Sequence, residues 1–143
     1  MKIGDLAART GLSVDTLRYY EKIGLIPPPL RDAGGHRVYD EPALRWLEFL
    51  ERLKATGMGI RDRLAYAELR ARGAATARER REMIERHRQK VSASIWELQQ
   101  TLELLDGKVA LYRKIEAGEA EDPAAVPASQ AGAPAVRKAK RRA

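Results

Sequence analysis

The sequence of 143 residues contains no cysteine. Disulfides, cysteine-based zinc sites, iron–sulfur clusters and thiolate nucleophiles are therefore excluded. Its two histidines, His36 and His87, lie far apart in the chain, and no carboxylates stand around them at a metal-ligand spacing. We expect no metal and no cofactor. Paired carboxylates, a glycine-rich phosphate loop and a nucleophile–base motif are also missing, which argues against an enzyme.

Long apolar runs are absent as well. A membrane-spanning helix needs about 18 consecutive apolar residues, and the N-terminus carries Lys2 and Asp5 in place of the apolar core of a signal peptide. We expect a cytoplasmic protein. The net charge of +7 is uneven, because five basic residues and no acids lie from Pro123 to the end. The part that folds is only weakly basic, so net charge alone does not indicate a nucleic-acid partner.

The N-terminal pattern predicts two short helices joined by a turn. Ile3 and Leu6 share one face of a helix over residues 3–9, which Gly11 ends. Ser13 is a favourable N-cap for a second helix, and Gly24 is a favourable left-handed residue after it. This order predicts a helix-turn-helix.

The second helix has two different faces. At about 100° per residue, Leu17 and Tyr20 fall on one side and can pack inward. The residues on the opposite side are polar or amphipathic: Asp15, Arg18, Tyr19 and Lys22. A face of that composition is typical of a surface that contacts DNA.

Turn signals dominate the next segment. Three consecutive prolines, residues 27–29, favour an extended path. The stretch "LRDAGGHRVYD", residues 30–40, then predicts two short strands joined at Gly34-Gly35. Asp40 is an N-cap for a third helix that carries Leu44, Leu47, Leu50 and Leu53 and ends at Gly57. A fourth, shorter helix is expected over residues 60–72.

The longest predicted element covers residues 77–117 and opens with a capping box from Thr76 to Glu79. Its apolar residues recur in alternating steps of three and four and form a seam: Ile84, Val91, Ile95, Leu98, Leu102, Leu105, Val109 and Tyr112. Only Arg88 interrupts the seam, which is about 42 Å long at 1.5 Å per residue. A stripe of this length requires a partner helix, most simply from a second copy of the chain. β-branched residues combined with leucine favour a parallel pair.

Three regions follow from these patterns: residues 1–73 as the DNA-binding domain, 74–117 as the dimerisation helix and 118–143 as a disordered basic tail. The tail is rich in Pro, Ala and Gly and has no large apolar anchors. Its basic run, residues 137–142, either adds non-specific attraction to DNA or only improves solubility.

Three stretches together resemble the MerR-type transcription regulators: "IGDLAARTGLSVDTLRYYEKIGLI", "GGHRVYDE" and "LKATGMGIRD". The resemblance covers about residues 1–115. It implies an all-α fold with a small β-hairpin wing, in which a winged helix-turn-helix precedes a long antiparallel coiled-coil helix. It also implies a homodimer that binds a pseudo-palindromic promoter operator, bends and untwists the spacer, and acts on RNA polymerase.

The resemblance and the helix geometry together give the candidate DNA contacts: Asp15, Thr16, Arg18, Tyr19, Lys22, His36, Arg37, Tyr39, Lys54 and Arg61. Arg18 is the best candidate for reading base edges. Its alternative is a solvated arginine paired with Asp15 or Glu21. Tyr39 could instead pack beneath the wing, and Lys54 and Arg61 could simply be solvated.

The sequence does not determine which effector, if any, the protein would respond to. Family members that sense metals or redox state use cysteines, and this sequence has none. Two alternatives are left: the protein responds to a small organic effector, or it has no effector. Tyr66, Met83, His87 and Trp96 could line an effector cavity; the alternative, which we favour, is that Trp96 packs on the partner's third and fourth helices. A rival function is a coiled-coil scaffold whose head binds protein. The polar outward face of the second helix argues against that rival.

Overall fold

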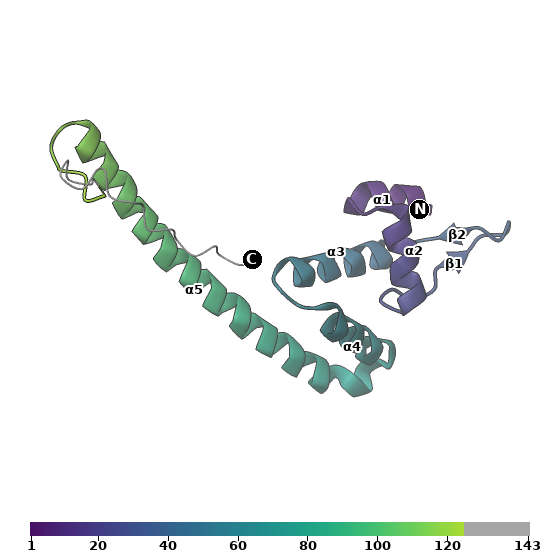
Figure 1. Cartoon of the computed structure of the whole chain (residues 1–143). Helices are drawn as coiled ribbons and strands as arrows, with labels where there is room; N and C mark the ends of the chain where they lie inside the picture. The colour runs from purple at the N-terminus through teal and green to yellow at the C-terminus, as the bar shows by residue number, and fades with distance from the viewer. Residues whose placement is uncertain (125–143) are drawn as a thin grey trace, which may run out of the picture. The chain divides into compact units, whose positions relative to one another are not determined.

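The computed structural model describes residues 1–124. Its elements are α1 (Ile3–Thr10), α2 (Val14–Ile23), β1 (Leu30–Arg31), β2 (Arg37–Val38), α3 (Glu41–Ala55), α4 (Ile60–Ala71), the 3₁₀ turn η1 (Gly73–Thr76) and α5 (Ala77–Glu116) (Figure 1). The chain divides after Ile95 into two compact units. The predicted boundary at residue 73 therefore falls at the turn before α5, whereas the first unit also includes α5 up to Ile95.

Local sequence signals set the ends of the short helices. The Ser13 side chain accepts a hydrogen bond from the Thr16 N–H at 3.0 Å and caps α2. In the same way Asp40 accepts from the Ala43 N–H at 2.9 Å and caps α3. Gly24 ends α2 with φ of 84°, a left-handed conformation that side-chain-bearing residues avoid.

The start of α5 differs from the prediction. Thr76 lies in η1, and its hydroxyl donates to the carbonyl groups of Leu69 and Gly73. An N-cap residue needs an extended backbone, but η1 runs directly into the helical backbone of Ala77. The capping box predicted from Thr76 to Glu79 is therefore wrong.

The core of the first unit lies where α1, α2 and α3 meet. Its most deeply buried side chains are all leucines: Leu6, Leu17, Leu25, Leu47 and Leu50. Two amphipathic rings join them and satisfy their polar atoms, because the Tyr20 hydroxyl donates to Glu51 at 3.0 Å and the Trp46 indole donates to the Leu25 carbonyl at 3.0 Å. Tyr20 is thus a core residue, as predicted.

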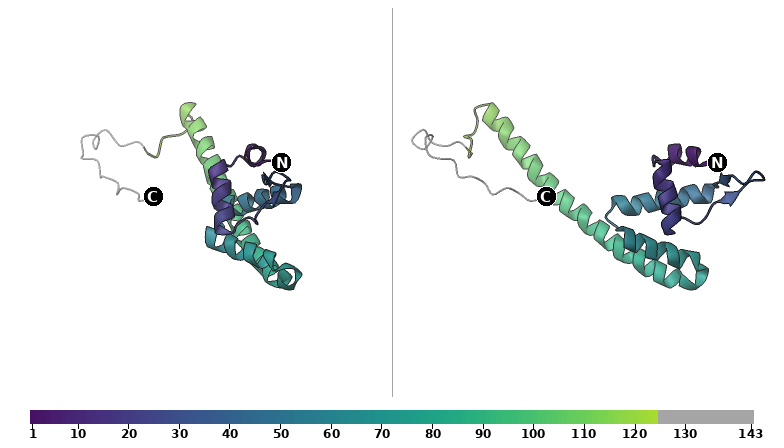
Figure 2. Two further views of the ribbon diagram at one scale, coloured as in Figure 1. Left: turned by 90° about the vertical axis from the view of Figure 1, so that its right-hand side faces the viewer. Right: turned by 45° about the vertical axis from the view of Figure 1, so that its right-hand side comes forward.

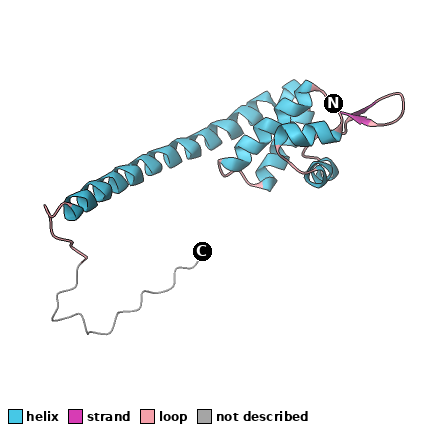
Figure 3. Cartoon of the chain, turned by 90° about the horizontal axis from the view of Figure 1, so that it is seen from above, coloured by secondary structure: helices cyan, strands magenta, loops and turns pink. Residues whose placement is uncertain are grey.

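The hairpin is short. β1 and β2 are antiparallel, with Leu30 opposite Val38 and Arg31 opposite Arg37. Gly35 takes φ of 80° in the turn, which explains why glycine is used there. The hairpin projects from the helices of the first unit as a wing, which we define as residues 30–38 (Figures 2 and 3).

The second unit begins at Trp96 and contains the rest of α5. Leu98, Leu102, Leu105, Val109 and Tyr112 are each between 49% and 69% exposed. None of the helices in residues 1–124 is both long enough and apolar enough to span a membrane. The basic run predicted at residues 137–142 lies outside the described residues.

We expect Leu50→Ala to lower the free energy of unfolding by about 2–5 kcal/mol, because it opens a cavity in the core. Leu30→Ala is a matched control: Leu30 is 70% exposed, so the same truncation should change stability by no more than about 0.5 kcal/mol. Urea unfolding of both variants at one protein concentration checks this. Equal losses would contradict the core assignment.

Candidate nucleic-acid interface

The outward face of α2 is exposed as predicted. Arg18 and Tyr19 are more than half exposed, and Lys22 is also exposed. The closest approach of Arg18 to Asp15 is 3.9 Å between two solvated groups, which is a weak ion pair. Arg18 is therefore available for another partner. Thr16 is half-buried, and its hydroxyl oxygen accepts from Ser13 at 2.8 Å within the helix cap.

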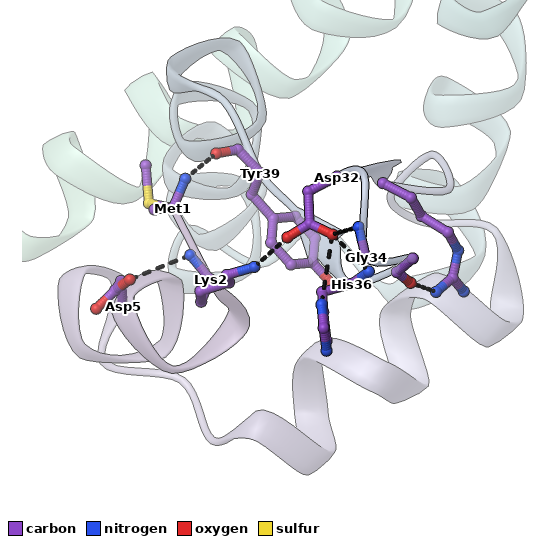
Figure 4. A network of polar contacts seen from close by, with 9 residues as sticks. Met1, Lys2, Asp5, Asp32, Gly34, His36 and Tyr39 are labelled. Carbon is purple, nitrogen blue, oxygen red and sulfur yellow. Dashed lines mark hydrogen bonds and ion pairs between the residues drawn. The ribbon is translucent and has the colours of Figure 1, made fainter.

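Asp32 organises the turn of the wing (Figure 4). One carboxylate oxygen accepts from the backbone N–H groups of Gly34 and His36, each at 2.9 Å. The other oxygen accepts from Lys2 Nζ at 2.6 Å. The lysine hydrogen bond, followed by the His36 N–H, lowers the pKa of Asp32 from 3.8 to about 2. The carboxylate form thus ties the wing to the N-terminus.

The first residue holds the base of the wing. The Met1 ammonium donates to the Tyr39 carbonyl at 2.6 Å, and the Tyr39 N–H donates back to the Met1 carbonyl at 2.8 Å (Figure 4). Arg37 of β2 also pairs with Glu21 of α2, with 3.3 Å between Nε and Oε2. These contacts fix the wing against α1 and α2.

A basic cleft lies between α2 and the wing, with a volume of about 280 Å³. Its lining residues include five that are or can be positively charged: Lys2, Arg18, Arg31, His36 and Arg37. Arg18, His36 and Arg37 were predicted DNA contacts, and the structure brings them together. Lys2 and Arg31 were missed, because only the folded wing places them beside α2. The arginine-rich stretch "LRDAGGHR" was the one signal that could have indicated Arg31.

Tyr39 takes the alternative position. It is 3% exposed, and its hydroxyl is buried without a hydrogen-bond partner in the described residues. Burial, with a smaller contribution from Glu21, raises the pKa of this phenol. Because the ring packs beneath the wing, it does not reach the surface as a DNA contact must, and we exclude it from the interface.

Two predicted contacts lie outside the cleft. Lys54 is exposed near the end of α3, and Arg61 is exposed in the first turn of α4. Neither lines the basic cleft. They remain candidates for a separate contact to the DNA backbone.

The structure gives different surroundings to the four predicted effector residues. Met83 and His87 line a small cleft beside the loop between α3 and α4. Tyr66 instead stacks on Trp46, with 5.8 Å between ring centres. Trp96 belongs to the second unit and is 62% exposed.

A helix-turn-helix with a hairpin wing and a basic cleft between them is a DNA-binding fold. Residues 2–39 match the MerR family regulatory protein. An uncharacterized HTH-type transcriptional regulator of Haemophilus influenzae is 40% identical over 111 residues, which are 78% of this chain and 82% of that protein.

Solved structures agree. The crystal structure of HiNmlR, a MerR family regulator lacking the sensor domain and bound to promoter DNA, matches with a TM-score of 0.73 and 38% identity over 82% of this chain and 89% of that one. A MerR family transcriptional regulator from Bacillus thuringiensis matches with a TM-score of 0.68 and 30% identity, over 78% and 98% of the two chains. The chain therefore belongs to the MerR family of DNA-binding transcriptional regulators.

The wing should loosen in acid. The pKa of Asp32 is lowered from 3.8 to about 2, so its ionised form stabilises the wing above pH 3.8, and that stabilisation is lost as the pH falls through about 2. Carboxyl-carbon NMR should place the midpoint of Asp32 near 2, and Lys2→Met should move it toward 3.8. Arg9→Met, which removes a charge that pairs with Glu41 instead, should leave it unchanged. A midpoint of 3.8 in the unaltered protein would contradict this structure of the wing.

Proposed function

We propose that the protein binds a pseudo-palindromic promoter operator as a homodimer, bends and untwists the spacer, and so controls RNA polymerase at that promoter in response to a small organic effector. The basic cleft between α2 and the wing carries the proposal. Arg18 lies on the helix that would enter the major groove, while Arg31, His36 and Arg37 lie on the wing beside it. One surface can thus read bases and hold the phosphates that flank them.

The exposed seam of α5 supports the homodimer. Five of its residues in the second unit are about half exposed or more, and leucines and aromatic rings in such a row are rarely left in water. Ile84 and Val91 continue the row in the first unit and are half-buried. A second copy of α5 offers the same row and would cover it.

The antiparallel direction rests on the family resemblance and not on the charges beside the seam. In a parallel pair, Lys108 would lie beside the partner's Arg113 and repel it, but Arg80 would lie beside the partner's Glu85 and attract it. Each such pair is worth at most about 1 kcal/mol, so the two nearly cancel. The antiparallel arrangement also separates the two DNA-binding surfaces.

Two separated DNA-binding surfaces could hold both flanks of an operator that is bent at its centre. Bending and untwisting a site of this size costs on the order of 1–6 kcal/mol, which phosphate contacts on both flanks must offset. The basic cleft supplies such contacts in each copy, and Lys54 and Arg61 are candidates to add more. A helix N-terminus such as that of α4, where Arg61 lies, favours phosphate.

We expect Arg18→Ala to weaken operator binding by about 1–3 kcal/mol while changing non-specific binding much less, because a base contact is lost. Arg45→Ala is the control: Arg45 is exposed on α3 but does not line the basic cleft. Competition binding with operator and random duplexes measures both affinities. An unchanged ratio in Arg18→Ala would mean that Arg18 only holds phosphate.

Replacing Leu98 and Leu105 with glutamate should give monomers in sedimentation, because four carboxylates would meet in the apolar seam of a dimer. Gln89→Glu combined with Gln100→Glu is the control, because it adds negative charge at two exposed positions of α5 outside the seam and should leave the dimer intact. A monomeric unaltered protein at micromolar concentration would contradict the dimer.

A further inference from the structure

A second cleft, distinct from the basic cleft, lies where α5 meets the loop between α3 and α4. Its volume is about 100 Å³, and it is lined by Gly57, Met58, Asp62, Met83, Arg86, His87 and Lys90. The four α5 residues are spaced i, i+3, i+4 and i+7 and therefore share one helix face. That face presents three side chains that can be positively charged and can donate hydrogen bonds: Arg86, His87 and Lys90.

His87 is the best-defined of these groups. It is only 9% exposed, and its Nε2 lies 2.7 Å from Thr56 Oγ1. The Thr56 hydroxyl can donate to the Arg52 carbonyl at 2.8 Å, and Nε2 then donates to Thr56 Oγ1. Nδ1 has no hydrogen-bond partner in residues 1–124, and in the protonated ring it is a donor that can bind an anion. The ring is fixed in place by Thr56 at the end of α3.

The charges around the cleft are mostly positive. Asp62 is the one acid in the lining, against Arg86 and Lys90, and no carboxylate oxygen of residues 1–124 lies within 4.0 Å of either base. Arg63 adds a buried positive charge beside the lining. It is 5% exposed, donates from Nε to the Met58 carbonyl at 3.1 Å and leaves Nη1 unpaired.

The backbone at the cleft also contributes positive charge. α4 begins beyond Gly59, where no side chain caps the helix, so its first N–H groups remain available. The partial positive charge of a helix N-terminus adds to that of Arg86 and Lys90. Side chains and backbone therefore both favour a negatively charged occupant.

We propose that this cleft binds the carboxylate or phosphate group of a small effector, with Arg86, His87 and Lys90 as its ligands. The inference rests on the proposed function, because it names the chemical class of the effector. The volume suits one such group. The loop that lines the cleft joins the ends of α3 and α4, which carry Lys54 and Arg61, so an occupied cleft would act directly on two candidate DNA contacts.

The test is an NMR titration of the full-length protein without DNA. Sodium phosphate and sodium acetate are added in separate series, with sodium chloride at matched ionic strength as the reference. We expect saturable shifts of the His87 ring and of the Gly57 and Gly59 amides with at least one of the two oxyanions. Shifts that chloride reproduces at the same ionic strength would overturn the proposal.

Two variants locate the binding. Lys90→Gln should weaken oxyanion binding about tenfold or more, since a charged hydrogen-bond donor is lost. Lys108→Gln removes the same charge from a part of α5 that does not line the cleft and should leave binding unchanged. Equal weakening by both variants would show a general charge effect and overturn the site.

A last series distinguishes a free effector from DNA phosphate. Random-sequence duplex is added to the protein saturated with the oxyanion. We expect the oxyanion to remain bound and Lys90→Gln to keep its non-specific affinity for duplex. Displacement of the oxyanion, with loss of duplex affinity in Lys90→Gln, would show that the cleft is part of the DNA interface. Failure to find any operator would refute the proposed regulator but would leave the oxyanion titration unchanged.

Discussion

The burial of Leu17 and Tyr20 on one side of α2 is the constraint on which the rest of the first unit depends. Both side chains are almost fully buried, and a helix turns by about 100° per residue. Fixing these two residues inward therefore fixes Arg18, Tyr19 and Lys22 outward. The same packing fixes the position of Glu21, to which Arg37 of the wing is paired. The core thus sets both what α2 presents and where the wing attaches.

The wing depends on contacts outside itself. A hairpin with two paired residues in each strand has little stability of its own. It is held at its base by Met1, at its turn by Lys2 through Asp32, and on its side by Glu21 through Arg37. The first two residues of the chain therefore support the candidate DNA-binding surface.

Features set by neighbouring residues could be read from the sequence. The caps at Ser13 and Asp40, the end of α2 at Gly24 and the two faces of α2 all depend on spacing within one segment, and the structure confirms them. Features set by tertiary contacts could not. Lys2 and Arg31 join Arg18 only after the wing has folded, and the burial of Tyr39 depends on what covers it. Thr76 was misread because a 3₁₀ turn, not an extended residue, precedes α5.

The central claim is that two copies of this chain distort one promoter operator through α2 and the wing. A hydroxyl-radical footprint on the DNA upstream of the protein's own coding region tests it most directly. The account predicts protection of two half-sites arranged symmetrically about a centre, with altered cleavage at that centre where the spacer is bent and untwisted. Protection of a single site with no symmetry, and with uniform cleavage beside it, would contradict the account.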